Sequence, residues 1–261
     1  MRAYKHRRSH RSLRLRLEAL EDRSLLTSYT ITDLGTGLIP TALNNNGQAV
    51  GYMENTSTQT TTSFLWSNGT LTPLTGVGAN PIATGINDSE EVVGTNIGKS
   101  GGFLLNVNTG AVTSLPLDPE AINDAGQVAG TGDGAEVYQN GTLIVSNNPL
   151  SGGAAAFATG ISGNGLVSGF NSGEPFIWNP ATGQVTNLGG NGAEALGVNN
   201  SRQATGQDGY NGDVIEAFLY SNGVLQDIGT LDGPADQSQG NAINNAGVVV
   251  GQDSDVGAFI Y

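Results

Sequence analysis

The sequence predicts an all-β fold, a six-bladed β-propeller of four-stranded blades that spans residues 29–261. Three observations carry this prediction. Forty of the 261 residues are glycine and 13% are charged, which suits many short strands and tight turns. A ten-residue unit recurs six times at blade-like intervals. The two ends of this region also read as complementary parts of one sheet.

The repeated unit has the pattern of a hairpin corner. In AINDAGQV, an apolar residue ends one strand, Asn123 and Gly126 open and close a type I turn, and Gln127 begins the return strand. The closing glycines of successive units lie 43, 36, 39, 37 and 45 residues apart, a spacing that suits a four-stranded blade. The six copies are ALNNNGQAVG (42–51), GINDSEEVVG (85–94), AINDAGQVAG (121–130), GISGNGLVSG (160–169), GVNNSRQATG (197–206) and AINNAGVVVG (242–251).

Two copies of the unit lack the turn glycine. Glu90 and Arg202 stand where glycine is wanted, and a left-handed conformation costs a residue with a side chain roughly 1 kcal/mol. We therefore expect these two corners to be distorted or looser than the others.

An aromatic strand, a turn and an outer strand follow each unit. We expect each blade to run from a small-residue inner strand, through the strand of the unit and the aromatic strand, to the outer strand. The outer strands include TLTPL, AVTSLPL, TLIVS, QVTNLG and VLQDIG. The aromatic strands are SFLW (63–66), GFLLNV (102–107), AEVY (135–138), PFIW (175–178), AFLY (217–220) and AFIY (258–261).

The sixth repeat has no outer strand after residues 258–261, and the matching piece lies at the other end of the region. Residues 29–35, YTITDLG, resemble the outer strands VTNLG and LQDIG. Pairing residues 29–35 with 258–261 would complete blade six and cover two sheet edges. An open solenoid or two stacked sandwiches would leave those edges bare, so the sequence favours closure by the two terminal segments.

Charge is divided unevenly along the chain. Residues 1–28 contain eight of the ten Lys and Arg, both His and three of the 23 acidic residues. The rest of the chain keeps Lys99, Arg202 and twenty acidic residues, a net charge of about −18. Because nucleic acid and anionic membranes bind clustered Lys and Arg, this composition excludes both as partners of the body. It favours cations or basic partners, with plain solubility as the alternative role of the charge.

The residue types that are missing exclude several chemistries. The sequence has no Cys, and both His lie within residues 1–28. Disulfides, thiolate metal sites, His-ligated zinc, and Ser-His-Asp or Cys-His catalysis are therefore excluded from the body.

The N-terminal segment, residues 1–28, is predicted to be a short amphipathic helix or disordered. It has no uninterrupted apolar run of seven residues, so it is neither an ordinary secretory core nor a membrane span. Its string RLRLEALEDRSLL resembles the basic LExLEDR-type leader of exported and surface proteins of planctomycete-type bacteria. This resemblance implies export to the cell surface or beyond. A solvated basic tail of a cytosolic protein is the alternative.

The order of motifs within each repeat resembles the extracellular HAF repeat family over nearly all of residues 29–261. That order is ITDLG, A-x-x-IN-x-x-GQVVG, AFLW, NG and xLG. The family is named after a His-Ala-Phe triplet, and here Glu216 and Gly257 stand where the histidine would be, before Ala-Phe pairs. The resemblance implies an exported, propeller-like protein in which any role of that histidine is lost.

Acidic residues are predicted to gather on one face of the propeller. The loops between second and third strands and those between blades emerge on one side, which we call the loop face, and the hairpin corners emerge on the other, the corner face. Carboxylates around one rim predict a binding surface, with solvated loop acids as the alternative reading. The residues predicted to contact a ligand are Tyr52, Glu174, Tyr210, Glu216, Asp232 and Asp236.

Two acidic loops suit Ca²⁺, which binds carboxylate, amide and main-chain oxygens. One is QDGYNGD, with Asp208, Asn211 and Asp213, and the other is GQDSD, with Asp253 and Asp255. Neither has the spacing of an EF-hand. The sequence requires no cofactor, and Ca²⁺ is the ion that these loops favour.

Catalysis would have to use carboxylates alone, and glycoside hydrolysis is a reaction class that does so. Asp118 and Glu194 occupy equivalent places in their repeats, three residues before the unit. Glu120 stands directly before the unit, a position that is threonine in three of the other repeats. These three residues are the catalytic candidates.

Three functions remain open, in order of preference. The first is an exported, monomeric binding module that meets an extracellular protein or glycan through its acidic loop face. The second is a structural surface protein without a ligand. The third is a carboxylate-based glycoside hydrolase.

Overall fold

The computed structural model describes residues 34–146, 156–190, 192–209, 214–231, 236–254 and 257–261. These residues belong to one compact unit that begins at Leu34. The basic N-terminal segment and all but the last two residues of the predicted closing strand, residues 29–35, lie outside the described part of the chain.

The described chain forms six antiparallel sheets, each made of strands that are consecutive in the sequence. Five sheets have four strands and the sixth has three. Blade 1 contains β1 (Leu38–Leu43), β2 (Ala49–Asn55), β3 (Thr60–Ser67) and β4 (Thr70–Pro73). Blade 2 contains β5 (Pro81–Ile86), β6 (Glu91–Asn96), β7 (Gly102–Asn106) and β8 (Ala111–Leu115), and blade 3 contains β9 (Asp118–Ile122), β10 (Val128–Thr131), β11 (Ala135–Gln139) and β12 (Thr142–Val145).

The second half of the chain repeats the same order of strands. Blade 4 contains β13 (Phe157–Ile161), β14 (Val167–Asn171), β15 (Glu174–Asn179) and β16 (Gln184–Asn187). Blade 5 contains β17 (Glu194–Val198), β18 (Ala204–Asp208), β19 (Glu216–Ser221) and β20 (Val224–Gly229), and blade 6 contains β21 (Ser238–Ile243), β22 (Val249–Asp253) and β23 (Gly257–Ile260).

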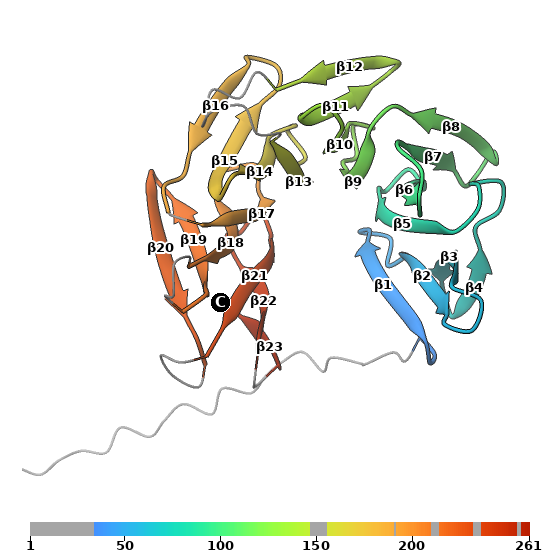
Figure 1. Cartoon of the computed structure of the whole chain (residues 1–261), viewed down its shortest axis with the longest axis horizontal. Coiled ribbons are helices and arrows are strands. Elements are labelled where there is room, and N and C mark those ends of the chain that lie inside the picture. The colour runs from blue at the N-terminus through green and yellow to red at the C-terminus, as the bar shows by residue number, and fades with distance from the viewer. Residues whose placement is uncertain (1–33, 147–155, 191, 210–213, 232–235, 255–256) are drawn as a thin grey trace, which may run out of the picture. The chain divides into compact units, whose positions relative to one another are not determined.

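The six sheets stand around a common centre as the blades of a propeller (Figure 1). The first strand of each blade contacts the first strand of the next, from β1 through β5, β9, β13 and β17 to β21. The predicted six-bladed propeller and its order of strands are therefore confirmed. Blade 6 has three strands among the described residues and no outer strand after β23, as the sequence predicted. Closure by residues 29–35 stays a prediction.

The closing glycine of each unit lets two strands approach closely. The first strand has a register irregularity opposite it in every blade, for example between Pro40 and Ala42 in blade 1. A methyl group on Gly51 would collide with the main-chain oxygen of Ile39, and one on Gly94 with that of Ile82. Glycine is thus required where the bulged inner strand crosses the second strand.

The two corners without a turn glycine keep the geometry of the others. Glu90 and Arg202 both adopt a φ of 59°, as the pattern predicted. Their main-chain N–H groups donate to the carbonyls of Asn87 and Asn199 at 3.2 Å, the length of the equivalent bond from Gly47 in blade 1. The expectation of distorted or looser corners is therefore wrong, because the surrounding hydrogen bonds hold these residues in the left-handed region.

The corner asparagines also connect successive blades, a role that the turn pattern alone did not predict. The side-chain Nδ2 of the first asparagine donates to the carbonyl oxygen of the corresponding residue in the next blade. This bond joins Asn44 to Asn87 at 3.0 Å, Asn87 to Asn123 at 3.1 Å, Asn123 to Ser162 at 2.9 Å and Asn199 to Asn244 at 2.9 Å.

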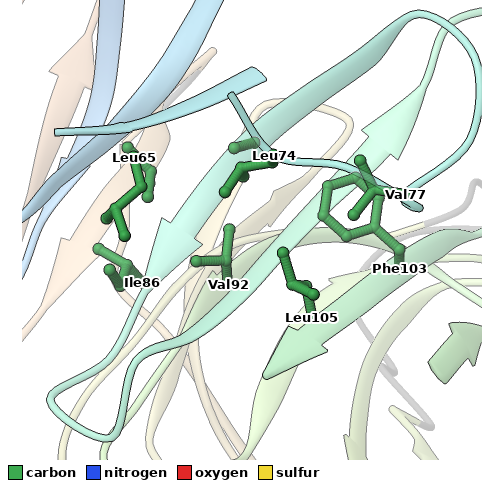
Figure 2. Close-up of a cluster of buried hydrophobic side chains, with 9 residues drawn as sticks. Leu65, Leu74, Val77, Ile86, Val92, Phe103 and Leu105 are labelled. Atoms are coloured by element: carbon green, nitrogen blue, oxygen red, sulfur yellow. The ribbon is translucent and has the colours of Figure 1, made fainter. Parts of the chain in front are cut away.

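Apolar residues fill the spaces between neighbouring blades. Figure 2 shows the cluster between blades 1 and 2, in which Leu65 from blade 1 lies beside Ile86 and Val92 from blade 2. Each interior blade is therefore buried on both faces, which explains strands that are apolar on both sides.

Blade 1 and blade 6 each have one face that does not pack against a neighbouring blade of the described chain. Residues on these two faces are more exposed than the corresponding residues of the other blades. Val250 of blade 6 is 43% exposed, whereas the residues in its place in the other five blades are buried, with Val50 at 0%. Leu43 of blade 1 is 69% exposed, and its counterpart Ile86 in blade 2 is 6% exposed. These two faces have the composition of an interface between blades.

Candidate functional site

Two hollows open on the loop face at equivalent places in the repeat. One lies between blades 2 and 3, with a volume of about 440 Å³, and the other between blades 5 and 6, with a volume of about 510 Å³. Each is lined by the loop between second and third strands of two neighbouring blades, together with the start of an inner strand. We call them the blade 2/3 hollow and the blade 5/6 hollow.

A chain of hydrogen-bonded amides runs along the blade 5/6 hollow. Gln252 Nε2 donates to Gln239 Oε1 at 3.2 Å, and Gln239 Nε2 donates to Gln207 Oε1 at 2.8 Å. Gln207 Nε2 in turn donates to Glu194 Oε2 at 3.1 Å. The carboxylate of Glu194, which only accepts, fixes the direction of the whole chain. Each amide keeps a second N–H group and a carbonyl lone pair for another partner.

Two aspartates hold the main chain around this hollow, and one of them, Asp253, also lines it. Asp236 is buried, and its Oδ1 accepts hydrogen bonds from the main-chain N–H of Gln237 and from the Ser254 hydroxyl. Asp253 Oδ2 accepts the main-chain N–H of Leu231 at 2.8 Å. Asp236 therefore positions the polypeptide around the hollow, while Asp253 and the glutamines contribute to its lining.

The blade 2/3 hollow is lined by carboxylates instead of amides. Asp118, Asp133 and Glu136 contribute to it, and Glu136 is 2% exposed. Glu136 Oε1 accepts the main-chain N–H of Asp133 at 3.0 Å. Glu136 Oε2 and Asp118 Oδ1 are buried without a hydrogen-bond partner among the described residues.

Desolvation raises the pKa of two carboxyl groups in blade 3, the buried Glu136 and Glu120 on β9. Desolvation raises the pKa of Glu136, the N–H of Asp133 opposes that shift, and the Asp133 carboxylate adds to it. Desolvation also raises the pKa of Glu120, and the nearby Asp118 carboxylate raises it further.

The catalytic candidates fall into two separate groups. Asp118 and Glu120 lie two residues apart on β9 and interact electrostatically. Glu194 begins β17, two blades further on, and takes part in the amide chain. Catalysis by these residues stays a prediction.

The predicted ligand-contacting residues are dispersed. Asp236 supports the blade 5/6 hollow. Tyr52 lies on β2, Glu174 begins β15 and Glu216 begins β19, and none of these three lines either hollow. Tyr210 and Asp232 lie outside the described residues.

The predicted calcium loops are only partly described. Asp208 ends β18 and Asp253 ends β22, while Asn211, Asp213 and Asp255 lie outside the described residues. Within the described ranges, no three Asp, Glu, His or Cys side chains converge as metal ligands. Calcium binding stays a prediction.

Two sequence-predicted residues line a hollow, Asp253 the blade 5/6 hollow and Asp118 the blade 2/3 hollow, whereas the glutamines were missed. Gln207, Gln239 and Gln252 gave no signal because single glutamines near strand ends are common. The position of Gln207 relative to the other two depends on the spacing between two blades. Glu136 did give a signal, since it replaces the phenylalanine of the aromatic strand.

Every regular element of the described part is a strand, so that part contains no helix long and apolar enough to cross a membrane.

No family model and no curated protein matches the chain. The resemblance to the HAF repeat family and to the leader therefore stays an expectation.

Solved structures resemble the chain at low sequence identity. A selenomethionine-substituted virginiamycin B lyase from Staphylococcus aureus matches with a TM-score of 0.55 and 13% identity, over 85% of this chain and 83% of the lyase. The extracellular domain of a putative hybrid two-component system from B. thetaiotaomicron matches with a TM-score of 0.45 and 13% identity, over 86% of this chain and 39% of that one. The likeness to the lyase shows a shared fold, and at this identity it shows nothing about ligand or activity.

Proposed function

We propose that this chain is an exported binding module that takes a hydroxyl-rich ligand, a glycan, in the blade 5/6 hollow of its loop face. The observation that carries the proposal is the hydrogen-bonded chain from Gln252 through Gln239 and Gln207 to Glu194. Primary amides both donate and accept, as the hydroxyl groups of a sugar do.

Size and fixed polar groups support a small-molecule site. A volume of about 510 Å³ lies within the range of roughly 300 to 1,000 Å³ that is usual for ligand pockets. Because each glutamine is already held by one neighbour, little side-chain entropy is lost when a ligand binds. Export rests on the resemblance of residues 7–27 to a leader, and fusion of residues 1–28 to a reporter tests it directly.

Affinity measurements on a glycan array test the proposal. The full chain is expected to bind a subset of neutral or basic glycans, and Gln239→Leu is expected to weaken that binding about tenfold or more, since it interrupts the amide chain. Gln226→Leu is the matched control, because Gln226 is exposed on the outer strand β20 and lines neither hollow. An array without any specific signal would instead favour a structural surface protein without a ligand.

A further inference from the structure

Blade 3 departs from the other blades at one buried position. The second residue of the aromatic strand is phenylalanine in five blades and Glu136 in blade 3. Phe64, Phe176 and Phe218 are 0% exposed and Phe103 is 2% exposed, and Glu136 is 2% exposed as well. The fold therefore buries a carboxylate where it elsewhere buries a ring.

A neighbouring side chain fills the space that the phenylalanine ring occupies in other blades. In blades 2 and 4, the tip of the ring lies against the closing glycine, so that a methyl on Gly94 or Gly169 would lie 2.6 Å from the ring carbon Cζ. In blade 3, Leu117 takes this place, since its Cδ1 would lie 2.6 Å from a methyl on Gly130. The Glu136 carboxyl group instead lies against Gly132 and lines the hollow.

The carboxylates of the hollow lack enough donors. Glu136 Oε1 accepts one main-chain N–H, and both Glu136 Oε2 and Asp118 Oδ1 are buried without a partner in the described chain. A buried acceptor without a partner is destabilising, and such groups in native proteins usually mark a functional site or an absent partner. Leucine or alanine would be the neutral choice for a purely structural position.

We infer that the blade 2/3 hollow binds an organic cation, an ammonium or guanidinium group, whose N–H groups donate to Glu136 and Asp118. Such a group supplies both the missing donors and the opposite charge. Pro116 and Leu143 form an apolar part of the wall against which an alkyl stem can lie. A metal ion fits less well, because no three ligating side chains converge among the residues that the structure describes.

This site differs from the proposed glycan site in both place and chemistry, so the two can fail separately. The net charge of the body, about −18, also favours cation binding, because it attracts cations at long range. Lys99 and Arg202 are the only basic residues of the body, and neither lines this hollow.

Titration of the ¹⁵N-labelled full chain tests the inference. The probes are 1,5-diaminopentane, agmatine and the capped tripeptide acetyl-Gly-Lys-Gly-amide, with 1-pentanol as the uncharged control. We expect saturable shifts of the Gly132 and Asp133 amides with the cations and none with pentanol. Binding by the tripeptide as tightly as by the diamine identifies a basic protein segment as the ligand, whereas binding by the free amines alone identifies a small molecule.

Variants separate the site from general charge effects. Glu136→Gln is expected to weaken cation binding about ten- to hundredfold. Glu54→Gln, which removes an exposed charge near the end of β2 that leads into the loop face, is expected to leave cation binding unchanged. Leu117→Ala/Glu136→Phe recreates the pair that blade 4 has in Ala156 and Phe176, so it is expected to fold and not to bind. The inference is overturned if the wild type shows no saturable shifts, if Glu136→Gln binds as well as the wild type, or if Ca²⁺ displaces the amines.

Discussion

Asn87 Nδ2 donates a hydrogen bond of 3.1 Å to the main-chain oxygen of Asn123, which lies 36 residues later in the next blade. The Oδ1 atom of the same side chain accepts the N–H groups of Ser89 at 3.1 Å and Glu91 at 2.9 Å. One buried side chain therefore holds its own corner closed and attaches it to the next. This double role explains why asparagine opens the turn in five of the six units.

Replacing this asparagine should destabilise the propeller. Asn87→Ala removes three side-chain bonds to the main chain and leaves buried groups without partners, so we expect a loss of about 2 to 4 kcal/mol in the free energy of unfolding. Urea denaturation measures it. Asn108→Ala, at an exposed site with a single long contact of 3.5 Å, should change stability by less than about 0.5 kcal/mol. Equal effects of the two variants would contradict the role given to the corner.

Blade 4 offers the reverse substitution. Ser162 holds its own corner through its hydroxyl but is too short to reach Asn199 of blade 5. Ser162→Asn should restore the bond between blades and raise the free energy of unfolding by about 0.5 to 1.5 kcal/mol. Thermal unfolding of the variant beside the wild type checks this, and a lower melting temperature would count against the corner bonds as a general device.

The raised pKa of Glu136 makes stability depend on pH. Because its pKa in the folded state lies above its ordinary value of 4.5, the native state binds more protons than the unfolded state over the interval between them. Stability contributed by this group is therefore highest below pH 4.5 and falls as the pH rises through the folded pKa. We expect Glu136→Gln to be closest to the wild type in acid and to gain relative stability towards pH 7. A difference that does not change with pH would contradict this.

Closure of the ring can be tested by a single engineered crosslink. If residues 29–35 form the outer strand of blade 6, analogy with the pairing of Leu219 and Gln226 in blade 5 places Thr32 opposite Ile260. Since the chain has no Cys, Thr32→Cys/Ile260→Cys should form one disulfide within the monomer under mild oxidation. The predicted product runs as a monomer with the two peptides joined. Crosslinked dimers would show that the exposed faces of blades 1 and 6 pair between chains instead.

The fold was predictable from the sequence because its information is local and repeated. The corner from Asn123 to Gly126 and the aromatic strand around Phe176 each follow from turn chemistry and β-propensity within ten residues. Six copies at blade spacing then specify the propeller. Corners that contain Glu90 or Arg202 show the limit of this reasoning, because bonds to neighbouring residues override a local conformational penalty.

The candidate sites were less predictable because they form between blades. Gln239 and Gln252 pair within blade 6, but the alignment of Gln207 with them depends on how β18 lies beside β21, and no pattern within one repeat encodes that. An acidic binding face stays a prediction, and the acids that the structure describes differ in their surroundings. Asp236 supports the wall of one hollow, while Glu136 lines another as a substituted core residue.

The side-chain amide resonances of Gln207, Gln239 and Gln252 give the most direct test of the proposed function. On addition of the oligosaccharide selected by the glycan array, we predict that these three NH₂ pairs shift together and saturate, while the side-chain amides of Asn45 and Asn245 on the corner face stay unchanged. Shifts confined to the corner face, or none at a concentration that saturates the array signal, would contradict a ligand site in the blade 5/6 hollow.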